Sequence, residues 1–111
     1  MSEPRLKSRL WTQMALRMAD AAGTPGAVLR HGDDSAGGIL VVLRGRAGLV
    51  VLDQVRDAAG EPAWTRGTGA APVDQATVDA YLARQTRRDP DLWVLEFEAP
   101  DLALPFPGRV V

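Results

Sequence analysis

Charged and polar side chains gather between residues 84 and 96, and this stretch is the densest set of groups that could do chemistry. The candidate binding residues are Arg84, Gln85, Arg88, Asp89, Asp91, Trp93 and Glu96. Guanidinium groups hold phosphates and carboxylates through paired hydrogen bonds, and carboxyl groups act as acids and bases. One hypothesis is therefore an anion site in which Arg84 and Arg88 hold the ligand and Asp89 or Asp91 moves a proton.

The same residues also have a structural interpretation, which is the favoured one. Arginines in the last turn of a helix interact with its exposed carbonyl groups, and Arg84 could form an ion pair with Glu96 or Asp91. Glu96 and Glu98 alternate along an expected strand, as on a solvent-facing strand surface. The binding hypothesis for this corner stays open beside the structural one.

Composition limits the remaining chemistry. The chain has one histidine, His31, and no cysteine, which excludes disulfides, thiolate metal sites and histidine clusters within one chain. His31, Ser35 and a neighbouring aspartate supply the residue types of a hydrolase triad, but such residues within one short segment are typical of a turn. The glycine pair at 37–38 precedes an apolar run and does not fit a phosphate loop. We expect no metal and no cofactor.

Charge and hydropathy bear on the class of partner. The net charge is −1, from 13 basic and 14 acidic residues, so no overall field attracts the chain to nucleic acid or anionic lipid. Basic residues do gather near the N-terminus, and a nucleic-acid site would need Arg5, Lys7, Arg9 and Arg17 in one patch. The longest apolar stretch, 37–43, is far shorter than the roughly twenty residues of a membrane span. We expect neither nucleic-acid binding nor membrane insertion, and a cytoplasmic location.

The elements that must position these groups begin with an N-terminal helix. Apolar residues recur every three or four positions from residue 6 to residue 22, which is the helical spacing. The expected buried face carries Leu10, Trp11, Met14, Met18 and Ala22. A glycine at 23 and a proline at 25 then end the helix.

Three apolar runs, at 27–30, 39–43 and 49–55, predict strands, and the short polar segments between them favour antiparallel hairpins in a meander. The second and third runs are almost continuously apolar and are expected at the centre of the sheet. A further strand is expected around Trp64, the one tryptophan for which no core position is predicted.

A second helix and a last strand follow. Asp74 is expected to cap the helix, which must end before Pro90 because proline disfavours helical geometry in the residue before it. In the strand at 92–98, Trp93, Leu95 and Phe97 alternate with the remaining residues and predict a core face.

These elements predict an α+β fold of two layers, in which two helices pack on a mainly antiparallel sheet of four or five strands. We expect a single domain over residues 1–98 and a proline-rich C-terminal tail over 99–111. The tail contains apolar residues and either packs back over the sheet, which is favoured, or docks into a partner.

Two motifs resemble a known family. Residues 81–85 read YLARQ and residues 87–96 read RRDPDLWVLE, and both are preceded by Leu6-Lys7-Ser8, Trp11 and the ALR of residues 15–17. Together they resemble short bacterial proteins grouped as domain of unknown function 1491. The similarity covers about residues 5–98 and does not include the tail. The resemblance implies one domain of this length, and the family supplies no substrate, cofactor or catalytic residue to carry over.

For function, the sequence favours a small cytoplasmic binding or protein-interaction module without catalytic activity. The alternative is a small enzyme or anion-binding protein with its site at the corner from Arg84 to Glu96. The expected partner is an unidentified protein, and two copies of the chain could also associate through the apolar strands or the tail.

Overall fold

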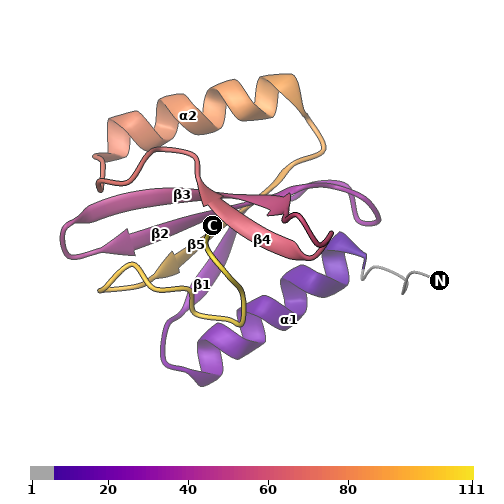
Figure 1. Ribbon diagram of the computed structural model, residues 1–111, viewed down its shortest axis with the longest axis horizontal. Helices are drawn as coiled ribbons and strands as arrows, with labels where there is room; N and C mark the ends of the chain where they lie inside the picture. The colour runs from indigo at the N-terminus through magenta and orange to yellow at the C-terminus, as the bar shows by residue number, and fades with distance from the viewer. Residues whose placement is uncertain (1–6) are drawn as a thin grey trace.

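The computed structural model describes residues 7–111 and consists of one five-stranded sheet with a helix on each face (Figure 1). Arg5 and Leu6, which entered the sequence interpretation, lie outside the described residues. In chain order the elements are α1 (Ser8–Ala21), β1 (Gly26–Arg30), β2 (Ile39–Gly45), β3 (Gly48–Arg56), β4 (Pro62–Arg66), α2 (Gln75–Arg88) and β5 (Trp93–Glu98).

The strand order is β1-β5-β2-β3-β4, with β2 and β5 parallel and all other neighbours antiparallel. The predicted hairpin between β2 and β3 is confirmed, but the prediction that β1 lies beside β2 is wrong. β5 occupies that place because it is apolar on both faces, with Leu95 on one and Val94 on the other, and such a strand belongs inside a sheet. Residues 31–38 cross the end of β5 to connect β1 with β2.

The α+β class, the mostly antiparallel five-stranded sheet and the two helices are confirmed. The layering differs from the expected two layers, since α1 and α2 lie on opposite faces (Figure 1). Successive side chains of β2 alternate between the two cores: Val41 and Leu43 pack on the α1 side, and Leu40 and Val42 pack on the α2 side. The continuous apolar run of β2 therefore serves two cores at once.

The face of α1 that contacts the sheet is not the predicted one. The buried residues are the small ones, Ser8, Thr12, Ala15 and Ala19. The large side chains expected in the core point to solvent: Leu10, Met14 and Met18 are 46%, 40% and 42% exposed. Small side chains let the helix lie close to the sheet, and Trp11 and Leu16 pack partly buried against the same core.

The predicted bounds of the second helix are confirmed. The Asp74 carboxylate accepts a hydrogen bond from the Thr77 backbone N–H at 2.9 Å and caps α2, which ends at Arg88. Val78 is the residue of α2 that is buried in the core on this side of the sheet, and Tyr81 and Leu82 pack partly buried against the same core.

The C-terminal tail packs back onto the sheet, as favoured from the sequence. Phe106 is buried among the residues of the α1-side core. The Trp64 backbone N–H donates to the Arg109 carbonyl at 2.8 Å, and the Val111 N–H donates to the Trp64 carbonyl at 2.8 Å. The tail thus covers the outer edge of β4, and Trp64 is buried with it. Within residues 7–111, no helix is long and apolar enough to cross a membrane.

Candidate functional site

The seven residues of the predicted corner lie in three places. Arg84, Gln85 and Arg88 are on the last turns of α2, Asp89 and Asp91 are in the turn that follows, and Trp93 and Glu96 are on β5. Trp93 belongs to the core beneath α1, whereas Glu96 lies three residues further along the strand and projects from the other face. The sheet therefore separates these two side chains, and ligand binding by the seven residues stays a prediction.

Glu96 has a structural partner. Its Oε1 accepts a hydrogen bond from Nη2 of Arg44 at 2.8 Å, and the same nitrogen donates to Oε1 of Gln75 at 2.6 Å. The group joins β2, β5 and the first turn of α2, so Glu96 pairs with Arg44 and not with Arg84. The side chains of the ion pair are 43% and 25% exposed, and exposed pairs of this kind contribute little to stability.

The acidic residues of the corner organise a turn. The Asp89 carboxylate accepts from the Asp91 backbone N–H at 3.1 Å, and the Asp91 carbonyl accepts from the Asp33 N–H at 3.0 Å. The Arg30 guanidinium donates to the Pro90 carbonyl at 2.8 Å. These bonds attach the turn before β5 to β1 and to the loop that follows it.

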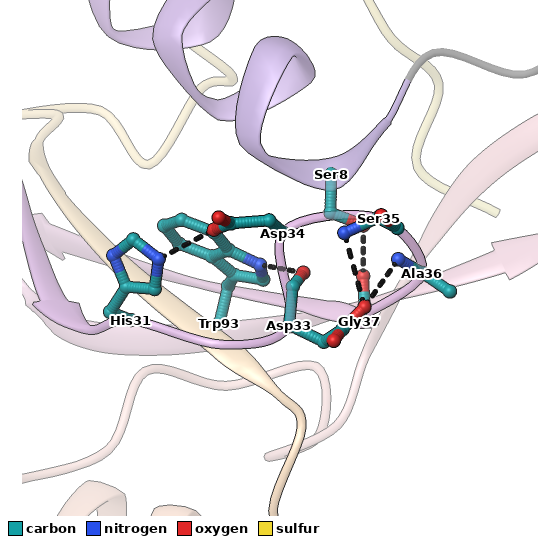
Figure 2. Close-up of polar contacts among 8 residues, drawn as sticks. All are labelled: Ser8, His31, Asp33, Asp34, Ser35, Ala36, Gly37 and Trp93. Atoms are coloured by element: carbon teal, nitrogen blue, oxygen red, sulfur yellow. Dashed lines mark hydrogen bonds and ion pairs between the residues drawn. The ribbon is translucent and has the colours of Figure 1, made fainter.

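That loop, residues 31–37, holds the side chains that resemble triad residues (Figure 2). Nε2 of His31 lies 2.7 Å from Oδ1 of Asp34, and the imidazole ring packs against the Trp93 ring with centroids 4.0 Å apart and the planes tilted by 37°. Nε1 of Trp93 donates to the Asp33 carbonyl at 2.8 Å. Figure 2 shows His31 and Ser35 at opposite ends of the loop, so the histidine does not face a serine nucleophile.

The loop instead caps α1. The Ser8 and Arg9 N–H groups, which have no partner within the helix, donate to loop carbonyls at 3.4 and 3.0 Å. The Ser8 hydroxyl donates to the Gly37 carbonyl at 2.6 Å (Figure 2). Asp33 closes the turn by accepting from the backbone N–H groups of Ser35 and Ala36. The interpretation of this segment as a turn fits these bonds.

A polar pair lies on the α2 side of the sheet and was not singled out from the sequence. The Tyr81 hydroxyl on α2 donates to Oδ2 of Asp53 on β3, while Oδ1 of Asp53 is buried with no hydrogen-bond partner among the described residues. Burial raises the pKa of the Asp53 carboxyl, and the hydrogen bond from Tyr81 partly opposes that rise. Burial also raises the pKa of the Tyr81 hydroxyl, so it remains a donor.

Two further residues, Arg84 and Gly67, pack against this pair. The guanidinium carbon of Arg84 lies 5.8 Å from the centre of the Tyr81 ring, within reach of a cation–π interaction. The backbone of Gly67 lies so close to the Tyr81 hydroxyl and the Asp53 carboxylate that a Cβ at this position would collide with both. Of the corner residues, Arg84 is thus packed on a tyrosine.

The outward face of α1 borders an apolar hollow. Its lining comes from the helix and the tail: Trp11, Met14, Ala15, Met18, Phe106 and Pro107. The volume is about 130 Å³. An apolar cavity of about 150 Å³ accepts benzene, so this hollow has room for one apolar side chain of similar size.

A second, polar hollow lies at the N-terminal end of the same helix. It has a volume of about 310 Å³ and is lined by Lys7, Arg9, Leu10, Gln13, Asp34 and Ser35. Leu10, on its wall, lies one helical turn from Met14 on the wall of the apolar hollow. The two hollows therefore border one surface along α1.

Sequence reasoning missed this surface because it assigned the largest side chains of α1 to the core. A second periodicity was present: the small residues Ser8, Thr12, Ala15 and Ala19 also recur at helical spacing. The Asp53 pair had a signal as well, since Asp53 is the one charged residue in the apolar run at 49–55.

The fold and these surfaces define a small α+β domain. It has an apolar hollow beside α1, and its polar side chains at the corner and at Asp53 are hydrogen-bonded within the protein. The chain belongs to the family described as protein of unknown function (DUF1491), whose model matches residues 6–107. The resemblance drawn from the two motifs is confirmed, and the match extends into the tail, which that resemblance omitted. No curated protein is significantly similar to this chain.

Solved structures support the same assignment. The chain is similar to a DUF1491 family protein from Caulobacter crescentus, with 29% identity and a TM-score of 0.84 to its crystal structure, over 96% of this chain and 100% of that one. The NMR structure of a DUF1491 family protein from the same organism matches with 28% identity and a TM-score of 0.82, over 98% and 99% of the two chains. A protein from A. tumefaciens, solved in solution, matches with 27% identity and a TM-score of 0.77, over 95% and 99%.

Proposed function

We propose that this chain is a small cytoplasmic protein-interaction module that binds a partner protein through the outward face of α1 and the adjoining tail. The observation that carries the proposal is the exposure of Leu10, Met14 and Met18, which are 46%, 40% and 42% accessible along one line of the helix. Contiguous exposed apolar surface beside polar residues marks interaction sites. Methionine suits such a surface because its flexible, polarisable side chain adapts to a partner.

The edge of the sheet at β1 is a weaker candidate for the binding surface. All five residues of β1 are exposed, and Val28 and Leu29 are 41% and 52% accessible. However, the register between β1 and β5 shifts between Val28 and Arg30. An irregularity of this kind twists an edge strand away from further pairing.

The alternative of an enzyme or anion site at the corner from Arg84 to Glu96 has less support. Glu96 is bonded to Arg44, Arg84 packs on Tyr81, and Asp89 bonds the backbone of its own turn. A ligand site at the corner would have to break these contacts.

Site-specific photo-crosslinking in cells of the native host tests the proposal. A photoreactive amino acid replaces Met14 on α1 in one variant and Ala83, an exposed residue of α2, in the control. We expect a defined protein adduct from position 14 and none from position 83. A Met18→Glu substitution added to the first variant should remove the adduct, because it places a charge in the apolar hollow.

Other outcomes contradict the proposal. Equal adducts from both positions, or adducts that survive Met18→Glu, would mean that the α1 face has no specific partner. An adduct with twice the mass of the chain would show that the partner is a second copy of the chain, as in a homodimer, and not a different protein. If position 14 gives no adduct, the α1 face is not the binding surface.

A further inference from the structure

We infer that the segment bound at α1 is an acidic amphipathic helix, an inference that rests on the proposed interaction at this face. The charges around the apolar line are the first reason. Lys7, Arg9 and Arg17 lie on or next to α1, and Arg17 falls three residues after Met14 and seven after Leu10, so it borders the apolar line on the helix surface.

These basic groups have no carboxylate partner in the described part of the chain. The ion pairs found within residues 7–111 involve His31, Arg44, Arg46 and Arg109, and none involves Lys7, Arg9 or Arg17. One acid, Asp20, lies on α1. The acids of the adjoining loop already have partners: Asp33 accepts from the Ser35 and Ala36 N–H groups, and Asp34 lies 2.7 Å from His31. On the helix and its N-cap the three cations outnumber the one acid, so this surface attracts carboxylates.

The arrangement of the two hollows sets the form of the partner. From Lys7 to Met18 the chain advances eleven residues, which is about 16 Å along a helix. A partner helix of about three turns covers this length and presents apolar residues at i, i+3, i+4 and i+7. Its apolar face would fill the hollow beside Met14 and Met18, and carboxylates along its flank and at one end would meet Arg17, Arg9 and Lys7.

A membrane surface fits this face less well than a protein helix. The apolar part is concave, with Trp11 and Phe106 in its walls, and a hollow accepts an inserted side chain. Asp20 and Asp34 would face the headgroups, and the net charge of −1 gives no general attraction to anionic lipid. These features favour a protein helix over a membrane surface, and vesicles serve as the competing probe below.

The test uses the full chain labelled at the methionine methyl groups and observed by NMR. The first probe is a synthetic amphipathic peptide of about fourteen residues, the length of α1, with leucines at helical spacing and glutamates on its flanks. The second is the same peptide with lysine in place of each glutamate. The third is vesicles of phosphatidylcholine with phosphatidylserine. We expect the acidic peptide to shift the Met14 and Met18 signals and to bind about tenfold or more tightly than the basic peptide.

Charge-reversal variants locate the contact. Arg9→Glu and Arg17→Glu should each lower the affinity for the acidic peptide about three- to tenfold and raise the affinity for the basic peptide, because attraction becomes repulsion. Arg87→Glu, on the exposed surface of α2, is the matched control and should leave both affinities unchanged. Affinity for the acidic peptide should also fall as salt is raised.

The outcomes separate this inference from the proposed function. Equal binding of both peptides at Met14 and Met18 would overturn the acidic partner and keep the apolar interaction face. No binding of either peptide would overturn the amphipathic-helix partner, while the crosslink from position 14 would still decide the proposed function. Vesicle binding through the same methyl groups, with no peptide binding, would overturn both in favour of a membrane contact.

Discussion

Asp53 is a half-buried carboxylate held by a single side-chain donor. One of its oxygens accepts from the Tyr81 hydroxyl, and the other is buried with no partner among residues 7–111. A buried carboxylate without hydrogen-bond donors destabilises the folded state, and the hydrogen bond from Tyr81 reduces this penalty. The Gly67 backbone packs against the pair so closely that a Cβ there would collide with both side chains. At this site stability therefore depends on one hydroxyl group.

Replacing Tyr81 by phenylalanine should lower the free energy of unfolding by about 1 to 2 kcal/mol at pH 7. Burial raises the folded-state pKa of Asp53 above its unfolded value, and loss of the hydroxyl raises it further. A raised carboxyl pKa means that stability falls as pH rises through the interval from about 4, the unfolded value, to the folded pKa. The penalty of Tyr81→Phe should therefore shrink as the pH is lowered from 7 toward 4, measured by urea unfolding.

Asparagine at position 53 provides the control for this prediction. In an Asp53→Asn background there is no carboxyl group to titrate, so the cost of Tyr81→Phe should be independent of pH. If the cost in the native background also stays constant with pH, protonation of Asp53 does not contribute to it.

At the scale of the secondary-structure element, α1 has two apolar faces with different roles. The face of small residues contacts the sheet, with Ala19 fully buried and Ala15 3% exposed. The face of large residues borders the hollow against the tail. Hydrophobicity alone does not decide between them, because a helix packs closely only where its side chains leave room for the strands.

Paired substitutions on α1 test which face supports the fold. Ala19→Leu should lower the free energy of unfolding by about 1 to 3 kcal/mol, because three more carbon atoms must fit beneath the helix. Met18→Lys, at the neighbouring exposed position, should change it by less than about 0.5 kcal/mol. Both new residues are good helix formers, so helix propensity does not explain a difference. A larger loss from Met18→Lys, in urea unfolding, would place the large-residue face in the core.

At the scale of the whole molecule, the tail completes the sheet. Phe106 contacts the rings of Trp11, Trp64 and Phe97 at centroid distances of 5.3, 5.7 and 5.6 Å. The backbone near Val110 forms a bridge with Trp64 on the outer edge of β4. The last residues thus cover an edge that would otherwise be open to pairing with other chains. They also form one wall of the hollow beside α1.

Phe106→Ala should therefore lower the free energy of unfolding by about 3 to 5 kcal/mol, the range for truncating a buried phenylalanine. Val111→Ala, at a residue that is 58% exposed, is the matched control and should change it by less than about 0.5 kcal/mol. A chain ended after Glu98 should lose at least as much stability and self-associate, since the edge of β4 becomes free. Chemical unfolding and light scattering measure these effects; a stable, monomeric truncated chain would show that the tail is dispensable.

Much of the local structure could be predicted because its signals lie within a few residues. Asp74 and Pro90 marked the limits of α2, and the alternation of Trp93, Leu95 and Phe97 marked a core face of β5. The motifs around these residues also identified the family. The candidate site was less predictable, because a run of charged residues in sequence does not show which face of a sheet each side chain takes.

The sequence by itself thus determined the α+β class, the position of the helices and strands and the absence of any cysteine chemistry. Only the tertiary structure decided that β5 lies between β1 and β2, that the small-residue face of α1 is buried, and that Asp53 meets Tyr81. The physical reason is the separation along the chain of the residues that interact. Caps, turns and periodicity act between near neighbours, whereas β2 pairs with β5 across about fifty residues and the available space there is set by every other packed side chain.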